Sequence, residues 1–565
     1  MYIVAESSRP SLLVPPRNAA GRGTIGINAI VCGSLLALLM VWAVIFPQTG
    51  DGDAIMHYLN ARDGLWEPAK LLGSWARVGA KIPLLIPAQF GILPARWASA
   101  IISILCAWQT IRLAEDLGIK RAWLAGPMLI FQPFVFALAG DTMTELPLAL
   151  GIVIAIRLWL SHRPWASCMV IGYLPTVRPE GFFLCALWAA MVIGARYAHP
   201  WKKRAAMVLT LGWGTMAWLA ACWVVHRNVN YFFTEWWAWP ADSMRIYGHG
   251  SFFAYPNRWP LYCGPVLFPL FVLGMIRSPG YTSGAARGAG NVFLLASGAA
   301  LLILEITLGP GIRENILPWA ALFLAGAIAW SVRREKLAVC VWVFVLIFTL
   351  HSILWWRGWF GSCGLMRILA CVAPITAIIC LRGWNVAVRR LPGFHRTLGI
   401  AGVAMMGVTA IGYYLVEPMH QRVFPLQRAC EFVTKNGLFA NVPKMILGDP
   451  MAQVCLHMGP NPQNVIANQC DRAAECKQLL AAPIGSAGLW DNQHAQAWFH
   501  VSPADLPTLG YSVLFTARQR PAMAIEWLEP ANLPREQVYL VVRKDRAGEM
   551  PLDVGGDTRR PSVAR

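Results

Sequence analysis

The sequence predicts a polytopic α-helical membrane protein that carries a small α/β domain outside the membrane at its C-terminal end. Apolar residues make up 56% of the 565 residues and charged residues 14%, whereas a soluble domain normally carries about 25% charged residues. The apolar residues are gathered into long blocks, and the basic residues stand in short segments between these blocks. From Glu417 onward the composition becomes that of a soluble domain.

Ile25–Phe46 is the first apolar block, and it carries no charged residue. Roughly 20 such residues cross a bilayer of about 30 Å. The block is not a secretory signal peptide, because it is too long, no clear small-residue cleavage site follows it and more spans come after it. Hydropathy predicts about 13 spans within a transmembrane domain of residues 25–416. Trp165–Pro175 is short and bounded by prolines, so it could be a half-helix. We count it as a span, since its loss would reverse every later loop.

The basic residues predict the orientation. Residues 1–24 contain Arg9, Arg17 and Arg22, so this N-terminal segment is expected in the cytoplasm. Counting from there places the basic loops on the cytoplasmic side throughout: Arg112–Trp123, Ser161–Trp165, Arg196–Arg204, Arg277–Gly290, Arg333–Lys336 and Arg382–Arg396. The formal net charge of +19 could suggest a nucleic-acid partner. Basic residues divided among short loops indicate the positive-inside bias instead, so we expect no nucleic acid.

Residues 417–546 predict a small extracytoplasmic α/β domain. Two expected helices alternate with three short apolar strands, in the order Phe424–Gly437, Lys444–Gly448, Asp471–Ala482, Tyr511–Thr516 and Gln537–Val542. Neither a Gly-x-Gly-x-x-Gly nor a Gly-Lys-Ser/Thr loop is present, so no nucleotide site is inferred. The last residues, 547–565, are expected to be a disordered tail.

Four of the 14 cysteines fall in this predicted domain: Cys430, Cys455, Cys470 and Cys476. One or two disulfides could form among them if the domain lies outside the cytoplasm. Free buried thiols fit the sequence equally well. A Cys470–Cys476 pair would close a short loop. The domain lacks a Cys-x-x-Cys pair, so a zinc site is not expected.

The first outer loop, Pro47–Ile82, holds two aspartates directly after the first span. Asp51 and Gly52 together signal a turn. Asp53 precedes a helical pattern, so it could act as a helix N-cap. Partial burial at the membrane face could instead raise its pKa and make it a general base. The sequence leaves both interpretations open.

Two later outer segments also carry charge. In Gly140–Glu145, Asp141 could cap the next helix, and its spacing to Glu145 would let both side chains share one helix face. In Thr176–Glu180, Arg178 and Glu180 stand at membrane depth, where charges are costly and are either functional or mutually paired. Both interpretations of this pair stay open.

Basic side chains on the outer side could bind a lipid phosphate, because guanidinium groups match phosphate geometry. The positive-inside bias disfavours basic residues on that side, so their presence there needs a reason. The candidates are Arg178, Arg245, His249, Arg258, Arg313 and Arg367. Many aromatic residues surround His249 and Arg258, and a belt at the bilayer interface explains most of these rings by itself.

Together these features resemble the GT-C superfamily of membrane glycosyltransferases. The resemblance covers nearly the whole chain and rests on the order of short motifs: Asp53–Ala61 with Trp66-Glu67-Pro68, Asp141–Glu145, Thr176–Gly181, Gly364–Arg367 followed by Pro374, Gly485–Asp491 and Leu506–Tyr511. Many members have Asp-Glu in the first outer loop, where this chain has Asp51-Gly52-Asp53-Ala54. We favour Asp53 as the matching residue, because it stands at the start of the predicted helix.

The resemblance implies a hexosyl- or pentosyltransferase, mannosyltransferase-like, in the bacterial inner membrane, with its active site and C-terminal domain in the periplasm. It implies a polyprenyl-phosphate sugar donor, inversion at the sugar carbon, a lipid, glycan or protein acceptor, and surrounding membrane lipids. Asp53 would be the base with Asp51 beside it, and Asp141 or Glu145 would orient the acceptor or help to hold a metal. The lipid phosphate would be bound by Arg178, Arg313, Arg367, His249 and Arg258. No cofactor is certain, and a divalent metal stays open.

Two other functions fit parts of the sequence. Buried Arg178 and Glu180 and proline-broken spans would suit a transporter or lipid flippase. A carrier, however, has no need of an acidic first outer loop or a globular outer domain. A polysaccharide polymerase or ligase would be expected to keep its essential residues in the large outer loop His226–Arg258.

Overall fold

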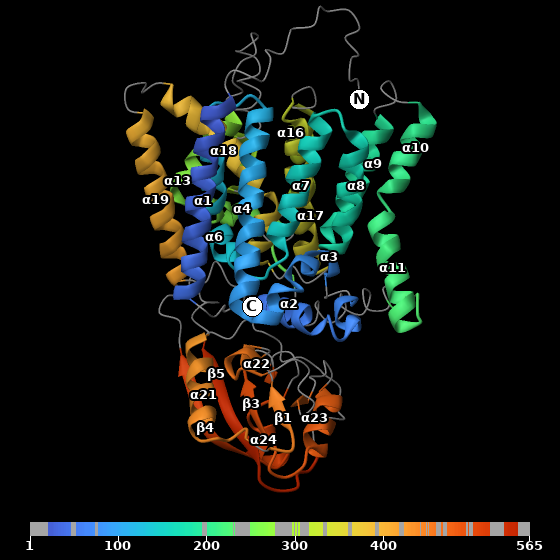
Figure 1. The fold of residues 1–565 in the computed structure, drawn as a ribbon, viewed down its shortest axis with the longest axis vertical. Coiled ribbons are helices and arrows are strands. Elements are labelled where there is room, and N and C mark those ends of the chain that lie inside the picture. The colour runs from blue at the N-terminus through green and yellow to red at the C-terminus, as the bar shows by residue number, and fades with distance from the viewer. Residues whose placement is uncertain are drawn as a thin grey trace, which may run out of the picture. The chain divides into compact units, whose positions relative to one another are not determined.

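The computed structural model divides by its internal contacts into two compact units (Figure 1). The helical unit comprises Met1–Pro47, His57–Leu415 and Trp527–Pro530, and the sheet unit comprises Gln48–Met56, Val416–Glu526 and Ala531–Arg565. The structure describes residues 21–46, 52–73, 77–194, 200–229, 231, 249–276, 296–298, 300–301, 303–304, 316–331, 336–359, 364–389, 395–416, 423–440, 442–447, 449, 451–458, 465–466, 472–492, 495–496, 501–519 and 536–551. The predicted division into residues 1–24, 25–416, 417–546 and 547–565 stays a prediction.

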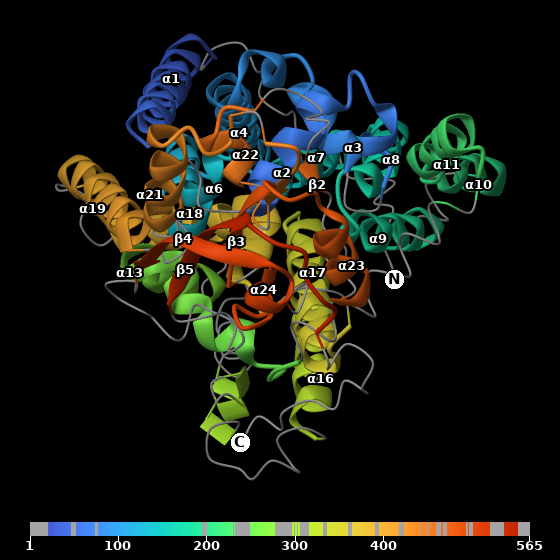
Figure 2. The same cartoon turned by 90° about the horizontal axis from the view of Figure 1, so that it is seen from below.

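The main helices of the helical unit run alongside one another, as Figure 1 shows. They are α1 (Gly21–Ile45), α4 (Ile92–Asp116), α7 (Glu145–Leu160), α8 (Pro164–Tyr173), α9 (Glu180–Gly194), α10 (Trp201–Thr210), α11 (Trp213–His226), α13 (Ala254–Ile276), α16 (Leu317–Ser331), α17 (Ala338–Arg357), α18 (Ala373–Val388) and α19 (His395–Val416). Seen along the helices in Figure 2, α10 and α11 stand on the opposite side of the bundle from α19.

Other helical elements connect these main helices. Those before α4 are α2 (Gly52–Asp63), η1 (Pro68–Leu71), α3 (Val78–Lys81), η2 (Ile82–Leu84) and η3 (Pro87–Phe90). Those after α4 are η4 (Ala122–Leu124), α5 (Ala125–Ile130), α6 (Pro133–Ala139), η5 (Leu174–Thr176) and η6 (Met366–Val372). In Figure 1, α3 lies at one end of the bundle.

Five helices in the described residues are long and apolar enough to cross a membrane, and the number rises to seven if each of two bent pairs is one span. Large apolar side chains are exposed along α1, α10, α16 and α19, among them Ile30, Leu209, Phe323 and Ile400. Such side chains are unfavourable in water and favourable against lipid. The protein is therefore a multi-pass membrane protein, while the predicted number of 13 spans and the orientation stay predictions.

One predicted span is shorter than expected. Trp165–Pro175 falls on α8, which has 10 residues, and on η5. A 10-residue helix rises about 15 Å, which is half of the hydrocarbon thickness. This segment therefore matches the half-helix alternative better than a full span.

Prolines and glycines shape the interior of the bundle. α5 and α6 meet at 78°, because Pro133 cannot continue the α5 helix and Gln132 takes an extended conformation before it. The Gln132 side chain then donates to the carbonyls of Met128 and Ala373. A Cβ at Gly383 would lie 1.9 Å from the carbonyl oxygen of Leu270, so α13 and α18 approach as closely as their backbones allow.

The described part of the sheet unit forms a five-stranded sheet in the order β2-β1-β3-β5-β4. Its strands are β1 (Met445–Leu447), β2 (Val465–Ile466), β3 (Ala487–Asp491), β4 (Tyr511–Gln519) and β5 (Gln537–Lys544). β1 pairs in parallel with β2 and β3, and β5 pairs antiparallel with β3 and β4. The helices of this unit are α21 (Val423–Lys435), α22 (Met451–Cys455), α23 (Arg472–Ala481) and α24 (Asp505–Thr508).

The predicted helices and strands of this unit are confirmed as α21, α23, β1, β4 and β5. β3 was not among the predicted strands, although its residues fall within the motif Gly485–Asp491. All five residues of β3 are buried, so the strand lacks the apolar–polar alternation that marks a half-exposed strand.

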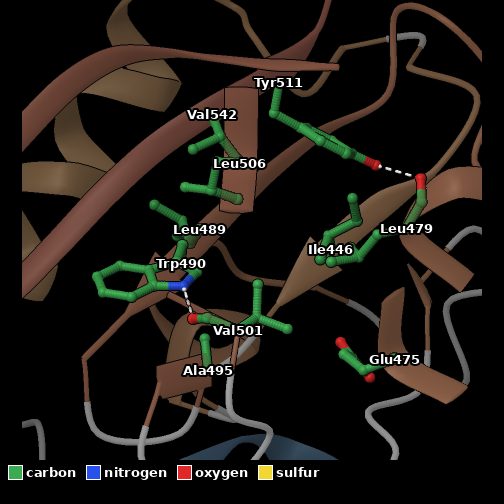
Figure 3. A pocket seen from close by; sticks show the side chains of 10 residues that line it. All are labelled: Ile446, Glu475, Leu479, Leu489, Trp490, Ala495, Val501, Leu506, Tyr511 and Val542. Atoms are coloured by element: carbon green, nitrogen blue, oxygen red, sulfur yellow. Dashed lines mark hydrogen bonds between the residues drawn. The ribbon is translucent and has the colours of Figure 1, made fainter. Parts of the chain in front are cut away.

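A small cavity lies in the core of the sheet unit (Figure 3). Apolar side chains line most of it, and the carboxylate of Glu475 also faces it. Tyr511 donates to the carbonyl of Leu479, and Trp490 donates to the carbonyl of Val501, both at 2.9 Å. The cavity measures about 20 Å³, which is room for roughly one water molecule. It is therefore a packing feature and not a substrate pocket.

Candidate functional site

A buried ion network surrounds Arg178 in the helical unit. Its guanidinium lies 2.8 Å from Glu145 Oε1 and 2.9 Å from Glu180 Oε1. It also donates to Thr144 Oγ1 at 2.8 Å. His351 Nε2 lies 3.3 Å from Glu180 Oε1. The network joins α7, α9 and α17 around the segment between η5 and α9.

The predicted Arg178–Glu180 pair is thus confirmed, and the structure adds Glu145 as a second carboxylate. Two carboxylates, Glu145 and Glu180, face the single positive charge of Arg178. Removing Arg178 would leave two buried carboxylates without their cation, and breaking a buried pair in this way typically costs about 3–5 kcal/mol. This arrangement suits Arg178 to hold the surrounding segments in position.

Asp141 does not cap the helix that follows it. α7 begins at Glu145 with Thr144 at the N-cap position, and Asp141 lies in the turn before the helix. The expectation that Asp141 and Glu145 share one helix face is therefore wrong. Asp141 Oδ1 instead lies 3.3 Å from Arg96 Nε, and both side chains are almost fully buried.

Arg96 ties the end of α1 to this acidic turn. Its guanidinium donates to the carbonyl of Gly140 at 2.8 Å, to that of Ala43 at 3.3 Å and to that of Phe46. The last carbonyls of a helix have no partner inside the helix, and Arg96 supplies one for α1. Because α1 leads into the first outer loop, Arg96 fixes the point from which that loop starts.

Polar groups beside the Arg178 network are buried without a hydrogen-bond partner among the described residues. They are Glu145 Oε2, His351 Nδ1 and the hydroxyl of Tyr262. Tyr262 lies within electrostatic range of Glu145, and the ring of Tyr255 stands edge-on to His351 with centroids 6.3 Å apart. Buried polar groups normally have partners. These atoms could therefore bind a polar ligand, such as one that offers hydroxyl groups.

The segment between α1 and α4 folds back against the segment that leads to Arg178. The hydroxyl of Tyr173 donates to the carbonyl of Gly79 at 2.7 Å. A Cβ at Gly79 would lie 2.2 Å from Thr176 Oγ1. α3 therefore packs on η5 so closely that only glycine fits at position 79.

This docking buries two basic residues of the segment between α1 and α4. Arg77 precedes α3 in the left-handed conformation, with φ 52° and ψ 54°, which costs a non-glycine residue of order 1–3 kcal/mol. Lys81, at the other end of α3, is 0% exposed. Burial lowers the pKa of Lys81 well below its usual range, and the positive charge of Arg77 lowers it further. The negative charge of an anion at this place would oppose both effects.

The same positive charges act on His57 of α2. Burial lowers its pKa well below the usual range, and the positive charges of Lys81, Arg77 and Arg178 lower it further. His57 is therefore neutral at neutral pH, and three buried basic residues act on it. The environment favours a bound anion over another cation.

The predicted base, Asp53, lies in the first turn of α2 and is half-buried. The predicted helix Asp53–Ala61 is confirmed within α2. The positive end of a helix dipole favours an ionised carboxylate. Asp53 and His57 are four residues apart, so they lie on the same side of α2. Asp51 lies outside the described residues.

The other predicted phosphate ligands take different positions. Arg258 of α13 donates to the carbonyl of Gly364 at 3.2 Å. Gly364 stands in the segment that leads to Arg367, which is half-buried in η6. His249 is exposed, while Arg245 and Arg313 lie outside the described residues. The roles of all these residues in binding stay predictions.

Sequence reasoning did not single out Arg77, Lys81, Arg96 or His351. A usable signal was present for three of them, because a charged or titratable residue in an otherwise apolar stretch is rare and often functional. Lys81 precedes an apolar run, Arg96 stands in α4 and His351 stands in α17. Arg77 had no such signal, because its importance comes from the docking of α3.

The described residues contain no group of three or more His, Cys, Asp or Glu side chains that could hold a metal ion. Metal sites in proteins usually take three or four such ligands. The metal-orienting role of Asp141 and Glu145 therefore stays a prediction, and Asp51 would have to be part of any test of it.

No protein-family model and no curated protein matches the chain. Its structural neighbours include two crystal structures of ArnT from Cupriavidus metallidurans, one bound to undecaprenyl phosphate and one in the apo state. Both matches cover 92% of this chain and 98% of the other at 14% sequence identity, with TM-scores of 0.44 and 0.41. At this identity and TM-score the likeness carries no argument about the fold, reaction or substrate of this chain.

Proposed function

We propose that this protein is a membrane glycosyltransferase of the GT-C type. It moves a sugar from a polyprenyl-phosphate donor to an acceptor outside the cytoplasm, with inversion at the sugar carbon. The observation that supports this function most is the docking of α3 on η5. It gathers buried Arg77 and Lys81 around His57, one turn along α2 from Asp53.

The buried basic residues suit the leaving group. A polyprenyl phosphate departs as an anion, so it needs positive charge more than it needs a proton. Arg77 and Lys81 lie where burial and mutual repulsion already penalise their charges. A phosphate placed between them would relieve that repulsion and favour the charged form of Lys81. We therefore assign leaving-group stabilisation to Arg77 and Lys81, with Arg178 holding the adjoining segment in place.

Asp53 is the proposed base. The acceptor hydroxyl gives its proton to the Asp53 carboxylate, and the acceptor oxygen attacks the anomeric carbon from the face opposite the phosphate. The bond between that carbon and the phosphate oxygen breaks, and the phosphate keeps the electron pair. General-base catalysis of this kind contributes roughly 10²–10⁴-fold. Asp51 is the alternative base, because it stands in the same loop.

The polar groups near Arg178 suit the sugar or the acceptor. Glu145 Oε2 and the Tyr262 hydroxyl are buried and have no protein partner among the described residues. Hydroxyl groups of a sugar can both donate to a carboxylate and accept from a phenol. We propose that Glu145 and Tyr262 orient the reacting sugar, and that Asp141 supports this turn through Arg96. Arg258 and Arg367 would also contact the lipid phosphate.

The decisive experiment measures sugar transfer by the purified protein from a radiolabelled polyprenyl-phosphate sugar. We expect Asp53→Asn to lower the transfer rate about 10²-fold or more, with normal expression and detergent stability. Asp51→Asn, tested in parallel, decides between the two aspartates. Glu431→Gln is the matched control, because that acid is largely exposed in the sheet unit and its loss should leave the rate unchanged.

The same assay separates an enzyme from a carrier. A glycosyltransferase releases free polyprenyl phosphate and a glycosylated acceptor, whereas a transporter or flippase moves the donor intact. Wild-type turnover in both aspartate variants would overturn the assignment of the base. Intact donor after incubation with membranes that contain the native acceptors would overturn the enzyme itself.

A further inference from the structure

Two cysteines meet inside the sheet unit. The side chains of Cys430 and Cys455 interact directly, and the helices that carry them, α21 and α22, pack against each other. Cys430 is buried, Cys455 is half-buried, and both are thiols in this structure. The two residues are 25 positions apart, so the contact is a result of the fold and not of sequence proximity.

Independent contacts hold both helices in place. α21 packs on β4 and β5, and Leu426, Ala429 and Val433 share the buried face on which Cys430 lies. Asp449 precedes α22, and its Oδ1 accepts a hydrogen bond from the backbone N–H of Met451 at 2.8 Å. Asp449 Oδ2 accepts from the Tyr539 hydroxyl of β5 at 2.6 Å. The two thiols are therefore kept together by the sheet and not by their own attraction.

The chemistry of the pair depends on the compartment. Adjacent thiols stay reduced in the cytoplasm and become a disulfide in the periplasm or outside the cell. The proposed function places the sheet unit outside the cytoplasm, and the inference rests on that orientation. We infer that Cys430 and Cys455 form a disulfide bond that joins α21 to α22 in the mature protein.

The bond forms by thiol–disulfide exchange with an oxidised dithiol oxidoreductase of the envelope. Cys455 is the more accessible of the two, so its thiolate attacks the disulfide of the oxidant and forms a mixed disulfide. Cys430 then attacks the sulfur of Cys455, closes the protein disulfide and releases the oxidant as a dithiol. Cys430 and Cys455 together lose two protons and two electrons, and the oxidant gains them.

The buried thiol of Cys430 is a poor nucleophile in the folded protein. Its contact with Cys455 and its burial raise the pKa of Cys430 far above its usual range. In the folded protein Cys430 therefore reacts slowly with small alkylating reagents even when it is a thiol. Alkylation of the folded protein cannot distinguish this buried thiol from a disulfide. For this reason the test uses denatured protein.

The experiment is mass spectrometry of the full-length protein, quenched with acid in cells and alkylated under denaturing conditions without reductant. Trypsin separates the relevant cysteines, because it leaves Cys430 in the peptide Ala429–Lys435 and Cys455 in Met445–Arg472. We expect these two peptides to be linked, and the link to disappear after reduction. The second peptide also contains Cys470, so variants are needed to identify the partner.

Cys455→Ser and Cys470→Ser form a matched pair for this purpose. Cys455→Ser should abolish the linked peptide and leave Cys430 fully alkylated, whereas Cys470→Ser should leave the link intact. Loss of the link in Cys470→Ser alone would overturn the assignment. Reduction should also lower the Tm of the wild type and of Cys470→Ser, and leave the Tm of Cys455→Ser unchanged.

A topology reporter fused after residue 551 distinguishes the inference from the function on which it rests. An extracytoplasmic reporter with both thiols alkylated overturns the disulfide and leaves the proposed glycosyltransferase untouched. A cytoplasmic reporter with both thiols alkylated overturns the disulfide together with the proposed orientation. An extracytoplasmic reporter with linked peptides supports both.

Discussion

Lys81 shows at the scale of a single residue how this protein holds charge inside an apolar unit. It is fully buried, and the charge of Arg77 opposes its own. Burial removes the hydration of its ammonium group, which costs free energy. We interpret this cost as one that a bound phosphate offsets.

Lys81→Met tests that interpretation. Because one preorganised donor to a developing charge contributes roughly 10²–10³-fold, we expect kcat/KM for transfer to fall by about that factor. We also expect the rate to fall by much more than the fraction of folded protein, because Lys81 acts on the bound phosphate. Rates and thermal unfolding are measured on the same preparation.

Lys435→Met is the matched control, since that lysine is 78% exposed. A purely structural role for Lys81 would instead lower the rate only in proportion to the folded fraction.

His57 gives the site a stability that depends on pH. Its folded pKa lies well below the usual range because of burial and of the charges of Lys81, Arg77 and Arg178, while the unfolded value is about 6.5. Below about pH 6.5 the unfolded chain therefore binds a proton that the folded protein does not bind. Stability is fully present above about pH 6.5 and falls as the pH decreases, by at most about 1.4 kcal/mol per pH unit.

Thermal unfolding from about pH 8 to pH 5 measures this contribution. The Tm of His57→Gln should fall less steeply on acidification than that of the wild type, because glutamine does not titrate. Equal slopes for the two proteins would mean that His57 is not held neutral by its surroundings.

At the scale of elements, the site depends on the close packing of α3 against η5. Tyr173 binds the carbonyl of Gly79 across this contact, and Gly79 has no room for a side chain beside Thr176. The same contact carries Arg77 and Lys81 toward His57. The position of the buried basic residues is therefore set by two short elements that lie almost 100 residues apart in the sequence.

Gly79→Ala should push α3 away from η5. A Cβ there would meet Thr176 Oγ1 at 2.2 Å, and overpacking of this kind typically costs about 1–3 kcal/mol. We expect a lower Tm and a loss of transfer larger than the loss of folded protein, because the basic residues move with α3. Adding Thr176→Ala should restore part of both.

Gly33→Ala in α1 provides the control, because a Cβ at that position would meet nothing within 4 Å. Its Tm should be equal to or above that of the wild type, since alanine favours the helix more than glycine does. Wild-type transfer in Gly79→Ala would show that the docking of α3 is not needed for the site.

At the scale of the whole molecule, the two units differ in where they place apolar and charged residues. The helical unit exposes apolar side chains and keeps charged groups such as Arg96, Arg178 and Glu180 inside. The sheet unit encloses an apolar core around Trp490 and Leu509. The predicted contrast between a membrane part and a soluble part thus reflects where each unit places its polar residues.

The sequence by itself determined the class of the protein and most of the regular elements near the C-terminus. Apolar blocks, basic loops and local periodicity are properties of neighbouring residues, so they can be read without the fold. They predicted α21, α23, β1, β4 and β5 and a short helix at Asp53. The local pair of Arg178 and Glu180 was also predicted, because its members stand only two positions apart.

Only the tertiary structure decided which distant residues share a site. Glu145 and His351 lie beside the Arg178–Glu180 pair although they belong to other helices. Asp141 lies against Arg96 instead of capping the helix that follows it. The gathering of Arg77 and Lys81 depends on a glycine that lets two backbones touch. Such contacts depend on how helices pack and how chain segments fold back, and no local pattern in the sequence records that geometry.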